Sequence, residues 1–255
     1  MPQFSANLGF LWQELSLCDG IQAAAGAGFA AVECHWPYDV DVSQVSATLE
    51  KTGLPMLGLN TRLGDKEAGE FGLSAVPGRE NEARAFIDEA VAYAVAIRCR
   101  NIHVMAGRTA GDEQANATYV SNLKYACEQA ALHSIGVLIE PINHRDVPGY
   151  HLSIVEDAMR VIAQVGHDNI SIMFDCYHTQ IMQGDLTTRL ASNLHAIGHV
   201  QIAAVPDRGE PDAGEVNFVA LMNALDQMPY TGFVGAEYKP RTTTDAGLGW
   251  LEPWR

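Results

Sequence analysis

Eight short apolar runs alternate along this chain with longer segments of helical periodicity, and this alternation constrains the fold more than any other feature. The apolar runs predict β-strands over residues 4–10, 30–36, 55–61, 101–107, 136–143, 170–178, 198–203 and 232–238. The intervening segments end at helix breakers and predict helices over 16–28, 42–53, 80–98, 114–133, 153–166, 186–195, 217–228 and 244–251. Such alternation indicates βαβ units and a parallel sheet.

The number of units and the chain length together favour a closed (β/α)8 TIM barrel. The chain has 255 residues, and about 250 are typical of this fold. An open, doubly wound sheet is the alternative, but no glycine-rich GxGxxG motif follows the first predicted strand. No linker rich in proline, glycine or serine divides the sequence, so we expect a single domain over residues 1–255.

Composition and charge restrict the compartment and the partners. No stretch of about 18 uncharged apolar residues occurs, and the N-terminal residues do not resemble a signal peptide, so we expect a cytoplasmic protein. The five cysteines are widely spaced without a CxxC pair, which predicts reduced thiols. The formal charge of −15 repels phosphate backbones and anionic membranes, so neither nucleic acid nor a membrane is an expected partner.

Four predicted strands contain a polar group directly after apolar residues: Glu140 in VLIE, Asp175 in IMFD, Gln201 in HVQIA and Glu237 in VGAE. Three of them have an ordinary alternative, with Glu140 as an exposed loop acid, Asp175 as a helix cap and Gln201 as a hydrogen-bonded amide. A buried, unpaired Glu237 would cost several kcal/mol, so it needs either Lys239 or a bound cation.

Considered together, these four groups occupy equivalent positions on the fifth to eighth predicted strands. In a barrel of this type the C-terminal ends of the strands open onto the active-site mouth. The ligand set is all oxygen, which suits a hard cation better than zinc. We therefore predict that Glu140, Asp175, Gln201 and Glu237 bind Mg²⁺ or Mn²⁺.

A small anionic substrate would need a local positive patch in a protein of this charge. Arg208 is the first candidate, because an arginine fork pairs with a carboxylate through two hydrogen bonds. The alternative for Arg208 is a surface salt bridge with Asp207 or Glu210. The segments 62–79 and 206–215 are longer than a connection requires and follow strands, so we expect a lid and a substrate-binding loop there. Further candidates for substrate contacts, each with a purely structural alternative, are His178, His144, Lys239, His103 and Asn7.

Several longer strings resemble one known family. The strings FSANLGF, EAGEFGLSAVPGRE, IEPINHRDVPGYHL, FDCYH, HVQIA, PDRGEPDAGEVN and EYKPRTTTDAGLGW resemble the hydroxypyruvate isomerases, within the xylose-isomerase-like TIM barrels. The resemblance extends from Phe4 to Arg255 without a large gap. GLSAVPGRE and the GLGW ending are nearer to the 2-oxotetronate isomerases of this family, whereas IEPINHRDVPGYHL is nearer to the hydroxypyruvate isomerases.

The resemblance implies a metal-dependent isomerase that interconverts hydroxypyruvate and tartronate semialdehyde, or else a relative that acts on the four-carbon acid 2-oxotetronate. It also implies that Glu140 and Glu237 are catalytic, while Asp175 and Gln201 complete the metal shell. Broader ketose epimerase relatives have histidine at the position of Gln201, and an amide is a weaker ligand than imidazole. The reaction moves a proton between adjacent carbons through an enediolate, for which two carboxylates and a metal are suited.

Other functions are alternatives on the same barrel. A sugar or inosose dehydratase, or a ketose epimerase, would keep the metal site, whereas a sugar-acid binding protein could dispense with the paired glutamates. A DNA-repair nuclease would need several zinc-binding histidines and a basic face, which the sequence does not suggest. The apolar C-terminal string GLGWLEPWR predicts docking onto the barrel or a second subunit, so a homo-oligomer is a further hypothesis.

Overall fold

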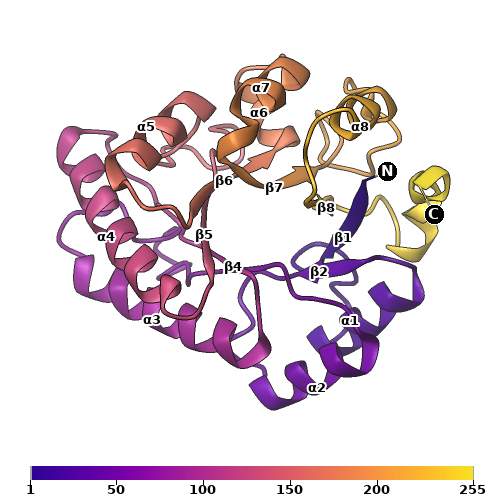
Figure 1. The fold of residues 1–255 in the computed structure, drawn as a ribbon, viewed down its shortest axis with the longest axis horizontal. Helices are drawn as coiled ribbons and strands as arrows, with labels where there is room; N and C mark the ends of the chain where they lie inside the picture. The colour runs from indigo at the N-terminus through magenta and orange to yellow at the C-terminus, as the bar shows by residue number, and fades with distance from the viewer. Residues whose placement is uncertain (1, 255) are drawn as a thin grey trace.

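The computed structural model describes residues 2–254 and has the predicted architecture, a parallel barrel surrounded by helices (Figure 1). The two end residues of the expected 1–255 domain lie outside the described part of the chain. Each predicted strand overlaps an observed one. The strands within residues 2–254 are β1 (Gln3–Asn7), β2 (Ala31–Glu33), β3 (Gly58–Asn60), β4 (Asn101–His103), β5 (Gly136–Ile139), β6 (Ile170–Asp175), β7 (Ile197–Ile202) and β8 (Phe233–Ala236).

The helices surround the strands, and several begin or end at recognisable signals. Asp112 and Asn217 each accept a first-turn backbone N–H, at 2.8 and 3.0 Å, and so cap their helices. Gly53 and Gly166 end two helices in the left-handed conformation, with φ of 73° and 68°. The helices are α1 (Leu17–Gly26), α2 (Val42–Thr52), α3 (Glu80–Ile97), α4 (Glu113–Ala131), α5 (Val155–Val165), α6 (Cys176–Met182), α7 (Leu186–Asn193) and α8 (Phe218–Asp226), with the 3-10 segments η1 (Leu194–Ala196) and η2 (Asp245–Trp254).

The sheet closes on itself between β2 and β3. Its hydrogen-bonded order is β2-β1-β8-β7-β6-β5-β4-β3, which leaves these two strands at its ends. There, the Val32 N–H donates to Pro55 O at 3.0 Å and the Leu57 N–H donates to Val32 O at 2.8 Å. A bridge between Val32 and Met56 lies at the same place. The open, doubly wound alternative is therefore wrong, and the C-terminal strand ends share one mouth.

The strand register brings several polar side chains to one level of the barrel. Asp175 on β6 is paired with Gln201 on β7, and Gln201 is paired with Gly235 on β8. The register of β6 and β7 shifts near Gly198, where an added Cβ would lie 2.7 Å from Ser171 Cβ. Residues from three successive strands thus become direct neighbours.

The strand predicted over residues 170–178 is wrong at its C-terminal end. β6 ends at Asp175, and α6 begins at the next residue. Asp175 Oδ1 accepts the Tyr177 N–H at 2.7 Å, so this carboxylate caps the new helix. One turn of that helix then carries His178 back to the mouth, beside Asp175.

The C-terminal segment docks onto the barrel, which was one of its two expected roles. Trp250 in η2 is buried, with its ring 5.2 Å from that of Phe4, and its Nε1 donates to Tyr238 Oη at 3.1 Å. Figure 1 places this segment beside β1. The second expected role, contact with another subunit, stays a prediction.

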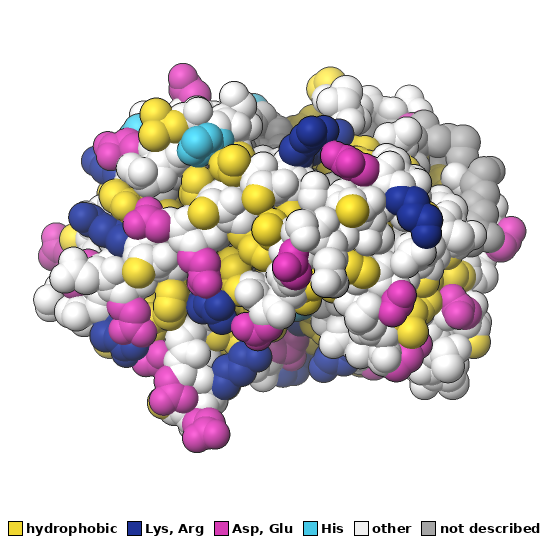
Figure 2. Space-filling model, turned by 90° about the horizontal axis from the view of Figure 1, so that it is seen from below, with side chains coloured by type: hydrophobic (Ala, Val, Ile, Leu, Met, Phe, Trp, Pro, Cys, Tyr) yellow, Lys and Arg dark blue, Asp and Glu magenta, His cyan; other side chains and the backbone are white. Residues whose placement is uncertain are grey.

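The surface adds two observations. Within residues 2–254, no helix combines the length and the apolar character needed to cross a membrane. On the face drawn in Figure 2, acidic and basic side chains are interspersed and do not gather into one basic patch.

Candidate active site

A cavity of about 360 Å³ opens at the C-terminal ends of the strands. Both segments predicted to bind substrate contribute to it, through Phe71 of 62–79 and Arg208 of 206–215. Its other polar lining residues include Asn60, His103, Glu140, His178, Glu237 and Lys239, and its aromatic wall includes Phe10, His35 and Trp36. The cavity therefore combines acids, imidazoles and positive charge with an aromatic wall.

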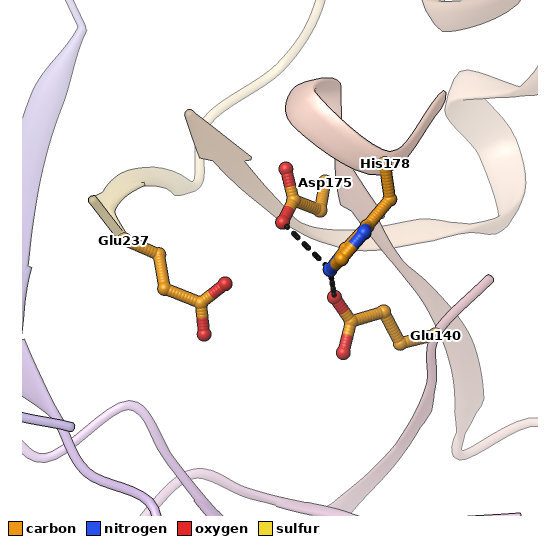
Figure 3. Close-up of side chains that lie close together, drawn as sticks. All are labelled: Glu140, Asp175, His178 and Glu237. Atoms are coloured by element: carbon orange, nitrogen blue, oxygen red, sulfur yellow. Dashed lines mark ion pairs between the residues drawn. The ribbon is translucent and has the colours of Figure 1, made fainter. Parts of the chain in front are cut away.

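Glu140, Asp175, His178 and Glu237 form a group that we call the mouth cluster. Each offers one ligand atom, and these atoms all lie within 4.8 Å of one another. In Figure 3 three of the side chains approach from one side, and Glu237 faces them from the other. His178 Nε2 lies 3.6 Å from Glu140 Oε1 and 3.5 Å from Asp175 Oδ2.

Three oxygens of the predicted metal ligands are buried without a hydrogen-bond partner among residues 2–254. They are Glu140 Oε1, Asp175 Oδ2 and Gln201 Oε1. Buried polar atoms are normally hydrogen-bonded, so unmet acceptors on three predicted ligands require an explanation. Oxygen donors of this kind fit a hard divalent cation such as Mg²⁺ or Mn²⁺.

Asp175 and Gln201 each have one polar atom that is anchored and one that is not. Asp175 Oδ1 caps α6, whereas its Oδ2 has no hydrogen-bond partner in the described chain. Gln201 Nε2 donates to Glu33 Oε2 at 2.7 Å, whereas its Oε1 is equally unmet there. The ordinary alternatives, a helix cap and a satisfied amide, thus account for only one atom of each side chain.

Glu237 differs because both of its oxygens have partners. Its Oε1 accepts from Asn7 Nδ2 at 3.0 Å and lies 3.1 Å from His35 Nε2, while its Oε2 accepts from Arg208 at 2.5 Å. The alternative in which Lys239 neutralises Glu237 is therefore wrong, because Arg208 is the cation that pairs with it. Lys239 is exposed at the rim, and its backbone N–H donates to Arg208 O at 2.7 Å.

Arg208 turns into the mouth, with only 11% of its side chain exposed. Its guanidinium lies between the rings of Phe10 and Tyr177, 4.6 and 4.9 Å from their centroids. Stacking and hydrogen bonding on this scale fix the orientation of the planar group. The alternative of a surface salt bridge with Asp207 or Glu210 is wrong, because the side chain points inward and pairs with Glu237.

His178 is oriented by the loop after β5. Its Nδ1 accepts the backbone N–H of Asn143 at 3.3 Å and lies 2.6 Å from Asn143 Nδ2. Because a backbone N–H can only donate, Nδ1 is unprotonated and the neutral ring carries its proton on Nε2. Burial lowers the pKa of His178 well below its usual range, which keeps the ring neutral. The Nε2–H group suits a substrate oxygen better than it suits a cation.

His103 is a second neutral imidazole at the cavity. Both of its ring nitrogens are buried without a hydrogen-bond partner among residues 2–254, and Nδ1 lies 3.8 Å from Glu140 Oε2. Burial lowers the pKa of His103 to about 3. Its unmet donor and acceptor are available to a bound ligand.

The two remaining predicted contact residues lie in different surroundings. Asn7 is buried and donates to Glu237, so it orients that carboxylate. His144 is exposed on the loop after β5 and is not among the residues that line the cavity. Its Nε2 lies 3.3 Å from Tyr150 O, so the structure does not bring His144 to the mouth cluster.

The three carboxyl groups of the mouth cluster respond differently to their surroundings. Burial raises the pKa of Glu140 well above its usual range, and the charges of Glu237 and Asp175 add to this effect. Burial also raises the pKa of Asp175 to about 7, against the opposing effect of Arg208. Burial alone would raise the pKa of Glu237, but Arg208 and His35 outweigh it and lower the pKa. One arginine therefore compensates one acid and leaves two in need of positive charge.

Comparison with known proteins assigns the fold to a family. Residues 21–254 match the family model of the xylose isomerase-like TIM barrels. The chain belongs to this family. It is 45% identical to the 2-oxo-tetronate isomerase of Cupriavidus necator, over 100% of this chain and 99% of that protein. It is 43% identical to the hydroxypyruvate isomerase of Escherichia coli, over 100% of both chains. The predicted resemblance to these isomerases is thus confirmed.

Solved structures have the same fold. A crystal structure described as an AP endonuclease, family 2, from Brucella melitensis has a TM-score of 0.97 and 42% identity, over 100% of both chains. The 3-keto-D-glucoside 4-epimerase of Escherichia coli has a TM-score of 0.82 at 21% identity, over 99% of this chain and 100% of that one. The second likeness shows the fold alone.

Sequence reasoning missed a further buried acid at a strand end of this barrel. Glu33, at the end of β2, forms what we call the inner cluster with Ser5, His199 and Gln201. Burial alone would raise the pKa of Glu33, but His199 and Ser5 outweigh it and lower the pKa. A signal for this residue exists, because Glu33 ends the run AAVE just as Glu140 ends VLIE.

Proposed function

We propose that this protein is a metal-dependent isomerase that interconverts hydroxypyruvate and 2-hydroxy-3-oxopropanoate. The observation that carries this proposal is the set of unmet, buried oxygens on Glu140, Asp175 and Gln201, at a mouth that also contains an inward-turned Arg208. Full-length relatives named as isomerases of this kind support the same reaction class.

Glu140, Asp175, Gln201 and Glu237 would hold Mg²⁺ or Mn²⁺. When bound, the cation would polarise the oxygens of the substrate and stabilise the negative charge of an enediolate. The raised pKa values of Glu140 and Asp175 support this assignment, because burial and mutual repulsion disfavour their ionised forms unless positive charge is added.

Glu140 and Glu237 are proposed to carry the protons. Conversion of hydroxypyruvate removes a proton from C3, returns one to C2 and moves the hydroxyl proton from O3 to O2, so that no atom is lost. The two glutamates face each other across the mouth, so one can accept the C3 proton while the other protonates C2 (Figure 3). A positioned acid or base contributes about 100 to 10,000-fold to such a rate. Their roles exchange in the reverse direction.

The remaining polar groups of the cavity are proposed to bind the substrate. Arg208 is positioned to pair with its carboxylate, and Lys239 adds positive charge at the rim. The Nε2–H of His178 and the ring of His103 can donate to substrate oxygens, since both imidazoles are neutral and face the cavity. These contacts would hold a small acid inside a protein of charge −15.

A four-carbon acid, 2-oxotetronate, is the second candidate substrate. The relative from Cupriavidus necator carries this activity in its name, at 45% identity. A cavity of about 360 Å³ leaves room for the additional CHOH group. Because the additional group lies at the end remote from the carboxylate, the same proton transfer would apply to both acids.

The test is an isomerisation assay of the purified protein with each acid, before and after EDTA treatment and after addition of Mg²⁺ or Mn²⁺. We expect turnover of at least one acid, loss of activity with EDTA and recovery with the metal. Activity that survives removal of the metal would contradict the metal mechanism. Product mass separates the alternatives, because an isomer has the mass of the substrate and a dehydration product has lost water.

A further inference from the structure

The carboxylate of Glu33 is a hydrogen-bond acceptor on both oxygens. Its Oε1 accepts from Ser5 Oγ at 2.7 Å and lies 3.0 Å from His199 Nε2. Its Oε2 accepts from Gln201 Nε2 at 2.7 Å and from Asn7 Nδ2 at 3.4 Å. Glu33 is only 4% exposed, so these groups provide the hydrogen bonds that water would otherwise make.

This carboxylate determines which way the Gln201 amide faces. An ionised carboxylate has no proton to donate, so the amide nitrogen of Gln201 must be the atom that contacts Glu33. The amide oxygen is then directed elsewhere, and it is the Gln201 atom that has no hydrogen-bond partner among residues 2–254. Reversal of the amide would place a donor where the proposed metal site needs an acceptor.

The same acid is linked to the opposite side of the mouth through Asn7. The Nδ2 group of Asn7 donates to Glu33 Oε2 and, at 3.0 Å, to Glu237 Oε1. The Oδ1 atom of Asn7 accepts the Gly9 N–H at 2.8 Å, which fixes the orientation of this amide as well. Glu33 therefore contacts Gln201, which is a proposed ligand, and Asn7, which contacts the proposed ligand Glu237.

Gly235 provides the space for this arrangement. It is the strand partner of Ser5 on one side and of Gln201 on the other. A Cβ at Gly235 would lie 2.4 Å from Glu33 Oε1 and 2.9 Å from both Gln201 Cγ and His199 Nε2. A side chain at this level would displace the carboxylate, so the local sequence of β8 accommodates Glu33.

We propose that Glu33 is a positioning residue, which orients Gln201 so that its amide oxygen is presented to the divalent cation. The proposal rests on the proposed function, because it concerns how the chain prepares one ligand for that metal. Partners that orient metal ligands typically change metal affinity by about 10 to 100-fold when they are replaced.

The first test is Glu33→Gln, with Mn²⁺ binding followed by the electron paramagnetic resonance signal of the free ion. The new amide has one acceptor oxygen and one donor nitrogen. With its oxygen facing the His199 ring, its nitrogen faces Gln201, where it can donate only if the Gln201 amide reverses. We expect Mn²⁺ binding to weaken about 10 to 100-fold. The matched control is Glu50→Gln, which removes the same charge from a side chain that is 66% exposed, and it should bind Mn²⁺ as the wild type does.

The second test exchanges acid and amide in the double variant E33Q/Q201E. The formal charge of the wild type is retained, the new amide donates to the new carboxylate, and the other oxygen of that carboxylate is free for the cation. We expect Mn²⁺ affinity equal to or above that of the wild type. Q201E alone should give no gain, because it opposes two carboxylates across a contact that is 2.7 Å in the wild type. The comparison of Q201E with E33Q/Q201E does not depend on whether E33Q alone folds.

The possible outcomes separate this proposal from the proposed function. Wild-type protein that binds no Mn²⁺ would contradict both. If the wild type binds Mn²⁺ and a folded E33Q protein binds it equally well, only the role of Glu33 is lost. A Q201E protein that gains as much affinity alone as on the E33Q background would likewise overturn the coupling of Glu33 to Gln201.

Discussion

Two buried clusters in this barrel contain acids, and the clusters differ in how completely the hydrogen bonds of those acids are met. In the inner cluster, both oxygens of Glu33 have partners, and the neighbouring His199 supplies positive charge. In the mouth cluster, Glu140 and Asp175 each keep one buried oxygen without a hydrogen-bond partner in the described chain, and a single arginine faces the acids. The acids of both clusters are buried, but the hydrogen-bonding capacity of the carboxylates is met in the inner cluster and not fully met in the mouth cluster.

This difference teaches which buried acids to associate with a ligand. Glu33, whose hydrogen bonds are all met away from the cavity, orients the protein around it. Glu237 also has partners on both oxygens, but it lines the cavity and pairs there with Arg208, the candidate substrate-binding residue. A buried carboxylate with an unmet oxygen costs free energy in the isolated chain, which is the usual condition of groups that act on something not yet bound. The comparison therefore predicts that variants in the mouth cluster lose activity, whereas variants in the inner cluster also lose stability or metal affinity.

The largest effect on activity is expected for Glu237→Gln. The amide keeps the shape of the side chain but cannot accept or return a proton, so kcat should fall about 100 to 10,000-fold at saturating Mn²⁺. Circular dichroism of the variant provides the control for folding. Full activity in a folded variant would remove Glu237 from the catalytic pair.

A large effect on stability is expected for His199→Leu in the inner cluster. The pKa of His199 is raised because Glu33 outweighs the effect of burial, so the two form an ion pair. Removal of one partner leaves a buried charge unpaired, which should lower the free energy of unfolding by about 3–5 kcal/mol in urea denaturation with EDTA present. His195→Leu, at an exposed position, is the control and should change little. Equal stability of both variants would contradict the comparison.

A smaller effect is expected for Arg208→Lys. Lysine keeps the charge but loses the planar fork and the stacking between Phe10 and Tyr177. A charge-assisted hydrogen bond contributes about 1.5–3 kcal/mol, so KM for the acid substrate should rise roughly 10 to 100-fold, with kcat changed less. A fall in kcat at constant KM would argue that Arg208 acts on the transition state instead.

Much of the fold and part of the site can be predicted from the sequence for a physical reason. Alternating apolar runs and helical segments dictate βα units, and an acid at the end of an apolar run must lie at a strand end. The contacts of the inner cluster cannot be predicted in this way, because Ser5 and Glu33 are 28 positions apart, and Glu33 and His199 are 166 apart. Such pairs depend on strand register, which local patterns do not specify.

The errors at strand ends have a common cause. The predicted strand over 30–36 includes Cys34, His35 and Trp36, but β2 ends at Glu33. The side chains of His35 and Trp36 are aromatic, yet they line the cavity. Hydrogen bonds to β3 continue past Glu33 only as far as His35, whose carbonyl oxygen accepts the Asn60 N–H at 2.8 Å in the described chain. Residues at the mouth face a cavity, so their hydrophobicity does not indicate strand continuation.

Glu140→Gln sharpens the comparison because it should separate activity from stability. Turnover should fall, but the EDTA-treated protein should become more stable by about 1 kcal/mol, or roughly 2–4 °C in Tm. Burial and the charges of Glu237 and Asp175 raise the pKa of Glu140 in the folded protein. Ionisation of Glu140 therefore opposes folding, and increasingly so as the pH rises above the pKa that this group has in the unfolded chain. The gain should therefore be larger near about pH 8 than near about pH 5. A loss of stability in the metal-free variant would show that the ionised Glu140 does not destabilise the metal-free protein.

The smallest effect is expected for His144→Ala, although His144 is only four positions from Glu140 in the sequence. Its side chain is exposed and contacts the backbone of its own loop, so its removal should change kcat/KM by no more than about 0.5 kcal/mol, or roughly 2-fold. His178→Ala is the informative partner, because it removes a buried donor from the mouth cluster and should reduce kcat/KM at least about 10-fold. If His144→Ala is as damaging as His178→Ala, the loop after β5 must move so that His144 reaches the substrate, and proximity to the mouth cluster in this structure would be an incomplete guide to function.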